Sequence, residues 1–457
     1  MTDPLVRRVP RSHASAWERK SSALCVVVCV VFAAVIGCGQ ENQPQTSSAP
    51  PASIEPNIVP PPPDPVVTKT TPPSKKQPTD IVRRYDGLTL IEWRQRIKDL
   101  DPKDPASAKA VSGLMEIVDD SDAPWHSRRQ AALTLGRIGP PAQEAVPMLI
   151  RLLDETGDGE DATSKWAARA LALFGPVAKS AAPVLIARLT NKSTRKHDRY
   201  AAIDALSQIG IADANVLPTL IQTLRSTDEE AQLRTFVAEA IAYLGPNAAA
   251  AVPALLRATG DDSENLRRTA VATIGVIGPM ADVAIPTLAE LLVFDESAAV
   301  RDQAADALSR IGSSATKLLT RLLADEDAEV RWRAAQGLGK IRPPAQSAVP
   351  ALTKALEDSN AEVRMHAMES QWAIRGEAKP LIPFLLAEFT NEDRQIRVRA
   401  YKLLIAMGKK SQPAIERLRE LAEDERPFVR QTARKALETL AKIDGKQTDD
   451  SSPNESN

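Results

Sequence analysis

The side chains most often used in metal and nucleophilic chemistry are scarce: the 457-residue chain has four histidines and three cysteines. A metal site or a nucleophile–base pair needs such side chains at short, defined spacing. His126, His197 and His366 are far apart in the sequence, and no two lie at metal-ligand spacing. Acidic pairs such as Asp261-Asp262 fall between predicted helices, where solvation is the simpler interpretation. We therefore predict no catalytic residue, no metal site and no cofactor.

Composition excludes further classes of function. The chain carries 58 basic and 59 acidic residues, a formal charge of -1, which provides no electrostatic drive toward nucleic acid. No phosphate-binding glycine loop or GxSxG nucleophile motif occurs. Hydrophobic residues make up 43% but aromatic residues only 4%. This balance favours helices that pack closely through small side chains.

The N-terminal segment has the pattern of an export signal. Basic residues precede an uncharged run of fifteen residues, 23–37, with the sequence ALCVVVCVVFAAVIG. A membrane-spanning helix needs about twenty apolar residues, whereas the core of a signal sequence needs roughly 7 to 15. The length favours a cleaved signal over 1–37, with an uncleaved short anchor as the alternative.

The end of this run, Val35-Ile36-Gly37-Cys38, resembles the bacterial lipobox. The resemblance implies cleavage before Cys38 and lipidation of its sulfur, and several acyl chains together hold a protein stably on a bilayer. Ordinary secretion is the remaining alternative. Gly39 stands where an inner-membrane retention signal has Asp, which favours the outer membrane. Cys25 and Cys29 would leave with the signal, so the mature protein would keep no free thiol.

A proline-rich segment follows up to residue 82. Twelve prolines fall between Gln43 and Ile81, including four in succession at 60–63. Such a segment buries too little apolar surface to fold and favours extended polyproline II structure. We interpret 38–82 as a lipidated cysteine with a disordered tether, and 445–457 as a disordered polar tail. A PxxP-type ligand role for the tether is the weaker alternative.

The remaining sequence repeats with a period of about 33 residues. An arginine opens each copy, spaced 30 to 36 residues from the last, at Arg128, Arg199, Arg234, Arg267, Arg301, Arg331, Arg364, Arg397 and Arg430, with Ser164 in the remaining place. Small or aliphatic residues recur three, seven and ten residues later, as in Ala270, Ile274 and Ile277. These offsets lie on one face of a helix.

Glycine and proline divide each copy into two helices. Gly-Pro pairs end the first helix, for example Gly139-Pro140 and Gly278-Pro279. Eight residues past the glycine a second proline, such as Pro147 or Pro286, opens the next helix. One such helix pair cannot bury its apolar face alone, but stacked pairs can.

The run D-x-x-x-x-V-R-x-x-A-x-x-A-L-x-x-I-G, together with the A-V-P-x-L opening of the other helix, resembles the HEAT repeat, especially the bacterial phycobilin-lyase type. The resemblance covers about residues 83–444. It implies an all-α fold, an α-α superhelix or HEAT/ARM-like solenoid of about eleven repeats. Some HEAT-like enzymes, similar to deoxyhypusine hydroxylase, bind iron through repeated His-Glu pairs. This chain has no His-Glu dipeptide, and no catalytic residue of a lyase can be matched.

The recurring arginine has two interpretations. A row of arginines at one repeat position looks like a binding ladder. Each also follows a turn that often carries Asp or Glu, so it can pair with acidic side chains or turn carbonyls of its own or the next repeat. The resemblance to HEAT proteins implies the same structural ladder, and we favour that interpretation.

A binding surface is expected on the concave face, lined by the helices that the arginines open. Residues one, two and five positions after the arginine should point outward there. In the C-terminal copies these include Trp332, Arg333, His366, Arg399, Lys402 and Lys435. A tryptophan flanked by arginine is typical of binding hot spots. The alternative is a solvated face with Trp332 packed between repeats.

Together these patterns predict an exported, lipid-anchored scaffold that binds protein partners at the bacterial cell envelope and is not an enzyme. A HEAT-like lyase or metal-dependent enzyme is the second hypothesis. A nucleic-acid-binding solenoid is the third, which export and near-neutral charge disfavour. The sequence specifies neither the partner nor the oligomeric state.

Overall fold

The computed structural model describes residues 83–155 and 163–446. The predicted signal sequence, Cys38, the proline-rich tether and the tail after Lys446 lie outside the described residues. Two compact units divide at Pro78 and Thr79, and only the second contains described residues.

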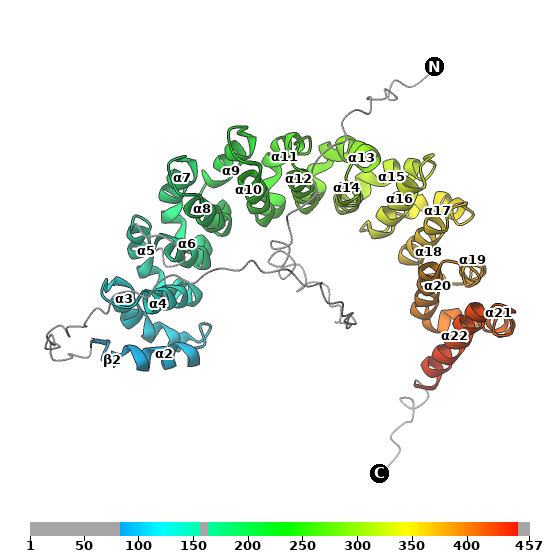
Figure 1. The fold of residues 1–457 in the computed structure, drawn as a ribbon, viewed down its shortest axis with the longest axis horizontal. Helices are drawn as coiled ribbons and strands as arrows, with labels where there is room; N and C mark the ends of the chain where they lie inside the picture. Colours follow the sequence, from blue (N-terminus) through cyan, green and yellow to red (C-terminus); the bar gives the residue numbers. More distant parts are fainter. Residues whose placement is uncertain (1–82, 156–162, 447–457) are drawn as a thin grey trace, which may run out of the picture. The chain divides into compact units, whose positions relative to one another are not determined.

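Within the second unit, helices alternate between two sides of a curved array (Figure 1). The even-numbered helices lie on the inner side, as expected for the helices that the arginines open. They are α2 Leu90–Asp99, α4 Trp125–Ile138, α6 Thr163–Phe174, α8 Lys196–Ile209, α10 Ala231–Tyr243, α12 Glu264–Ile277, α14 Ala298–Ile311, α16 Ala328–Lys340, α18 Ala361–Arg375, α20 Arg394–Ala406 and α22 Pro427–Lys446.

The odd-numbered helices form the outer layer. They are α3 Val111–Asp119, α5 Val146–Leu152, α7 Ala182–Thr190, α9 Val216–Arg225, α11 Val252–Ala258, α13 Ile285–Phe294, α15 Thr316–Leu322, α17 Val349–Ala355, α19 Ile382–Glu388 and α21 Ile415–Leu421. Each inner helix packs on the next inner helix and on the outer helices beside it. The predicted all-α solenoid is confirmed.

Glycine and proline have the roles that the repeat predicts. Gly139 and Gly278 adopt φ of +71°, a conformation that other residues avoid, and each ends an inner helix. A short 3-10 turn follows, such as Gly278–Ala284, and the second proline then lies in the first turn of the outer helix, as Pro286 does in α13. There its missing N–H costs nothing, because that group has no helical partner.

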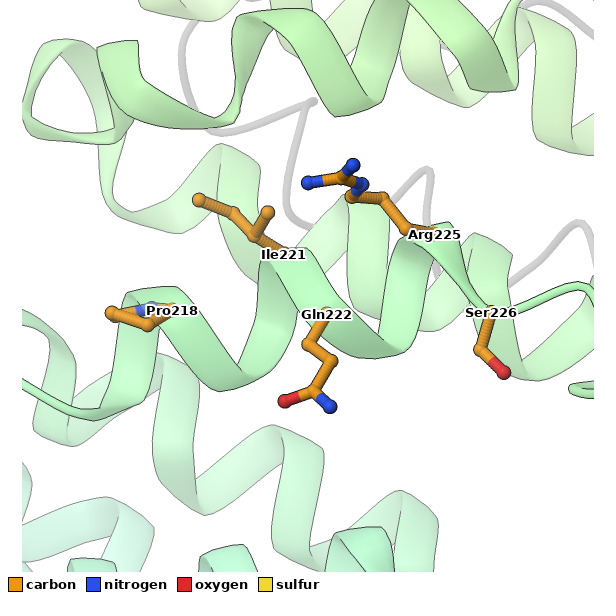
Figure 2. A pocket seen from close by; sticks show the side chains of 5 residues that line it. All are labelled: Pro218, Ile221, Gln222, Arg225 and Ser226. Carbon is orange, nitrogen blue, oxygen red and sulfur yellow. The ribbon is translucent and has the colours of Figure 1, made fainter.

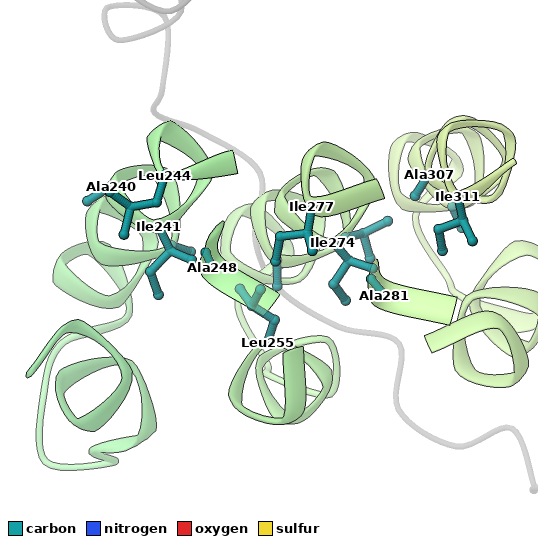
Figure 3. Packing of buried hydrophobic residues seen from close by; sticks show 14 of the residues in the cluster. Ala240, Ile241, Leu244, Ala248, Leu255, Ile274, Ile277, Ala281, Ala307 and Ile311 are labelled. Carbon is teal, nitrogen blue, oxygen red and sulfur yellow. The ribbon is translucent and has the colours of Figure 1, made fainter. Parts of the chain in front are cut away.

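The core runs along the array as one continuous apolar layer. Ala270, Ile274 and Ile277, at the predicted offsets of three, seven and ten, are fully buried. Figure 3 shows Ile274 and Ile277 of α12 between Ile241 of α10 and Ile311 of α14. Since each repeat covers the apolar face of its neighbour, burial is shared between repeats, and each such side chain contributes about 1.5–3 kcal/mol.

The first described residues form a small hairpin that the repeat pattern did not predict. Strand β1 Arg84–Tyr85 pairs antiparallel with β2 Leu88–Thr89. The Tyr85 hydroxyl donates to Asp120 at 2.7 Å, and the indole of buried Trp93 donates to the Tyr85 carbonyl at 2.8 Å. The hairpin therefore closes this end of the apolar layer.

Two stretches of the described chain, Thr163–Thr190 and Glu264–Phe294, are long and apolar enough to cross a membrane by composition. Each contains two helices separated by a glycine of positive φ, Gly175 or Gly278. Half of the most apolar window is buried in the first stretch and a third in the second. Both stretches are helix pairs of the array rather than single straight helices.

Candidate protein-binding surface

The repeated arginines are bound inside the array. Arg267 shows the arrangement: Nη1 donates to the carbonyls of Asp261 and Asp262 at 3.0 and 3.1 Å, in the turn before its own helix. Nε and Nη2 donate to Asp295, in the next turn, at 3.1 and 3.3 Å. The side chains of Arg267 and Asp295 are 8% and 5% exposed. One guanidinium thus connects two repeats and is unavailable to a ligand.

The same double contact recurs along the chain. The arginine–carboxylate pairs are Arg128–Glu155, Arg199–Glu229, Arg234–Asp261, Arg301–Glu329, Arg331–Asp358 and Arg364–Glu388. Arg397 and Arg430 donate to carbonyls of the preceding turn. The prediction that these arginines pair with acidic side chains or turn carbonyls of their own or the next repeat is confirmed.

Ser164 replaces the arginine in one repeat, and the local bonding changes accordingly. Its hydroxyl donates to buried Asp198 of the following repeat at 2.7 Å. Arg195 binds the other oxygen of Asp198 at 2.8 Å. The carboxylate therefore comes from the neighbouring helix α8, and the link between the two repeats persists.

Of the six candidate binding residues, Trp332, Arg333 and His366 form a cluster between α16 and α18. The indole and imidazole rings stack with centroids 5.1 Å apart and planes at 19°. The Arg333 guanidinium lies 4.4 Å from the centre of the Trp332 ring. Arg333 is 3% exposed and binds Asp302 at 2.6 Å and Glu329 at 2.9 Å. The cluster holds neighbouring inner helices together, and only half-buried Trp332 reaches the surface.

Arg399 extends this cluster to α20. It binds Glu362 and Glu369 of α18, which also flank the His366 ring. Both carboxylates already share their charge with Arg399. Burial, with the charges of Arg399 and Lys340, therefore dominates and lowers the pKa of His366 to about 3. His366 is neutral at physiological pH.

Lys402 and Lys435 are exposed on the inner helices α20 and α22. The Lys435 ammonium lies 5.3 Å from the centre of the Tyr401 ring. The expectation that all six side chains point outward is wrong for Arg333 and His366, because these two side chains are buried between adjacent inner helices. That the remaining residues bind a protein stays a prediction.

One hollow in the described part of the chain, of about 480 Å³, is lined mainly by the outer helix α9. Figure 2 shows Ile221 and Arg225 on one side of this helix and Gln222 with Ser226 on the other. These polar groups do not converge on one point, and among the described residues no three His, Cys, Asp or Glu side chains gather as metal ligands would.

Comparison with known proteins agrees with this geometry. A family model for HEAT repeats matches residues 217–309, 253–328 and 315–380, and one for the PBS lyase HEAT-like repeat matches 127–155. No curated protein sequence matches the chain significantly.

Several solved structures are similar to the chain at low sequence identity. An engineered protein is 24% identical over 72% of this chain and 98% of its own, with a TM-score of 0.36. Kap121p is 15% identical over 77% of this chain, with a TM-score of 0.48, and yeast importin-beta (Kap95p) is 12% identical over 77%, with a TM-score of 0.42. The chain spans 43% of the Kap121p chain and 59% of the Kap95p chain. The stacked helix pairs and the matches to repeat models together identify HEAT repeats in this chain, matched over residues 127–155 and 217–380.

Proposed function

We propose that this protein is a lipid-anchored scaffold that binds protein partners at the bacterial cell envelope through the inner face of its HEAT array, and that it has no catalytic role. Repeat arrays of this kind present long curved surfaces on which a partner can be bound. The anchor would be Cys38, at the end of the apolar run 23–37.

The binding proposal rests on a difference among the cations of the inner helices: the repeated arginines are bound within the array, whereas two lysines are exposed. The repeated arginines are bound by turn carbonyls and carboxylates, so they fix the spacing of the repeats. Lys402 and Lys435, by contrast, are exposed on successive inner helices and project from that fixed frame. Val398, 39% exposed, and half-buried Trp332 add apolar area to the same face. A rigid frame with exposed cationic and apolar groups suits a protein partner.

Partner binding is tested by recovery from solubilised envelopes with the full-length protein as bait. The double variant Lys402→Glu, Lys435→Glu should recover at least tenfold less of the partners bound by the wild type. The matched control, Lys354→Glu with Arg419→Glu, makes the same charge change at exposed positions of the outer helices α17 and α21 and should recover them normally. Equal recovery by the two variants contradicts the proposal.

The anchor is tested separately by phase partitioning in a clouding detergent. Wild-type protein should enter the detergent phase, because at least two acyl chains hold it there. The Cys38→Ala variant should lose its lipid label and remain in the aqueous phase or as uncleaved precursor. A Cys25→Ala variant, altered inside the proposed signal, should behave as wild type. Lipid labelling that survives Cys38→Ala would contradict the anchor.

A further inference from the structure

The inner helices α4 and α6 contain five cations and no carboxylate. Their cations are Arg128, Arg129, Arg137, Lys165 and Arg169. Arg128 is buried within the arginine ladder. The other four are exposed, and we refer to Arg129, Arg137, Lys165 and Arg169 as the cationic patch.

The four cations share one surface. Arg129 and Arg137 lie two turns apart on α4, and Lys165 and Arg169 one turn apart on α6, so each pair occupies one helix face. The helices approach closely, since a side chain on Gly136 of α4 would lie 2.6 Å from the Ala170 carbonyl of α6. With helix axes roughly 10 Å apart and eight residues rising about 12 Å, the cations are concentrated in a small area.

Several other inner-face cations pair with carboxylates, whereas the four residues of the cationic patch have no carboxylate partner among the described residues. Arg310 pairs with Asp306 at 2.8 Å, Lys340 pairs with the same carboxylate at 3.3 Å, and Arg399 pairs with two glutamates. Within 83–155 and 163–446, none of the four patch residues forms an ion pair. Their charge is therefore available to a ligand.

Apolar groups border the cations. Trp125 is 41% exposed and Leu173 45% exposed. The Arg129 guanidinium lies 6.0 Å from the centre of the Trp125 ring. Tryptophan and arginine are among the residues enriched at the binding hot spots of protein interfaces. The phosphate backbone of a nucleic acid would gain little binding energy from contact with Leu173.

We propose that the cationic patch binds a short acidic segment of a partner protein that also carries apolar side chains. This inference rests on the proposed scaffold function and adds a ligand class at α4 and α6. An extended segment of four or five residues, at about 3.3 Å each, spans the patch.

The surroundings favour a short segment over nucleic acid. At the repeat position of Arg169, the next two inner helices carry Asp204 and Glu239. Desolvation raises the pKa of Asp204, and the charge of Arg169 opposes that shift without forming an ion pair. A DNA duplex presents one charge per roughly 1.7 Å and would continue over these carboxylates, whereas a short peptide ends before them.

The test is fluorescence anisotropy with full-length protein in detergent and a labelled eight-residue peptide of alternating Glu and Leu. Wild type should bind, with affinity falling as salt rises. Arg129→Glu with Arg169→Glu should weaken binding at least tenfold, and the milder Arg137→Gln with Lys165→Gln should weaken it about threefold. Melting curves confirm that both variants remain folded.

Lys354→Glu with Arg419→Glu is the outer-face control and should bind as wild type. Equal affinity of the patch variants and this control overturns the inference, as does tighter binding of a single-stranded oligothymidylate than of the peptide. Lys402→Glu with Lys435→Glu should leave peptide binding unchanged. If the patch variants bind the peptide as wild type does, while the Lys402→Glu, Lys435→Glu variant still loses its envelope partners, this inference fails and the proposed function stands. Normal recovery of envelope partners by all variants contradicts the proposed function itself.

Discussion

Arg331 binds both carboxylate oxygens of Asp358 in the following repeat, Nε to Oδ2 at 2.8 Å and Nη2 to Oδ1 at 2.9 Å. Its Nη1 donates to the carbonyls of Asp325 and Glu326 at 2.9 Å each. The hydrogen bonds to Asp358 raise the pKa of Arg331, against the effect of burial. One side chain therefore fixes the turn before its own helix to the turn before the next inner helix.

Replacing this arginine should loosen one junction of the array. Arg331→Ala leaves Asp358, 12% exposed, without its cation, and we expect a loss of about 2–3 kcal/mol. Hydrogen exchange should accelerate in α16 and α18 first, because a repeat array opens locally. The control is Arg417→Ala on α21, which removes an ion pair with Glu420 whose two side chains are each 62% exposed, and should cost under about 0.5 kcal/mol. Equal losses of stability from the two substitutions would show that the repeated arginines do not hold neighbouring repeats together.

Close packing of α4 on α6 depends on Gly136. A Cβ there would lie 2.6 Å from the Ala170 carbonyl oxygen and 2.8 Å from the Leu173 Cβ, so Gly136→Ala must push the helices apart. We expect a cost of about 1–3 kcal/mol, measured as a lower melting temperature. Gly260→Ala is the control, because its Cβ would meet only the Arg257 carbonyl, at 3.6 Å. An unchanged melting temperature for Gly136→Ala would mean that this contact is not tight.

Stability should fall with acidity partly because of His366. Its pKa is about 3 in the fold, below the value of 6.5 in an unfolded chain. Between these values the unfolded chain binds the extra proton, so the stability present above pH 6.5 is lost progressively as pH falls toward 3. Compared with the His366→Asn variant, the wild-type protein should lose about 2 kcal/mol more of its free energy of unfolding between pH 7 and pH 4.5. Denaturation curves at both pH values measure this difference, and parallel pH dependence in the two proteins would contradict a buried neutral imidazole.

Much of the fold follows from the repeat alone. Ala334, Leu338 and Ile341, three, seven and ten residues after Arg331, are fully buried as their spacing predicts. The glycine ends of the inner helices and the proline starts of the outer helices are local preferences that stacking leaves intact. The arginine ladder was predictable for the same reason, since the acidic turn recurs with it.

The candidate surface was less predictable because exposure depends on how closely neighbouring helices approach. A Cβ on Gly339 would lie 2.9 Å from the Ser370 Cα, so α16 and α18 pack tightly there. That contact joins residues far apart in sequence, and the pattern of one helix does not contain it. Arg333 and His366 lie in this seam and are buried. The cationic patch is hard to predict for a different reason: its signal in the sequence is the lack of any carboxylate in α4 and α6, and no residue type or spacing marks that lack.

The most direct test of the central proposal is photo-crosslinking in the intact native cell, with the photoreactive amino acid placed on either side of the array. Substituted at Val398 or Lys402 on the inner helix α20, it should capture discrete partner proteins. Substituted at Arg419 on the outer helix α21 or at Lys354 on α17, it should capture few or none. Partners captured equally from both sides, or only from the outer helices, would contradict the account that this protein binds through its inner face.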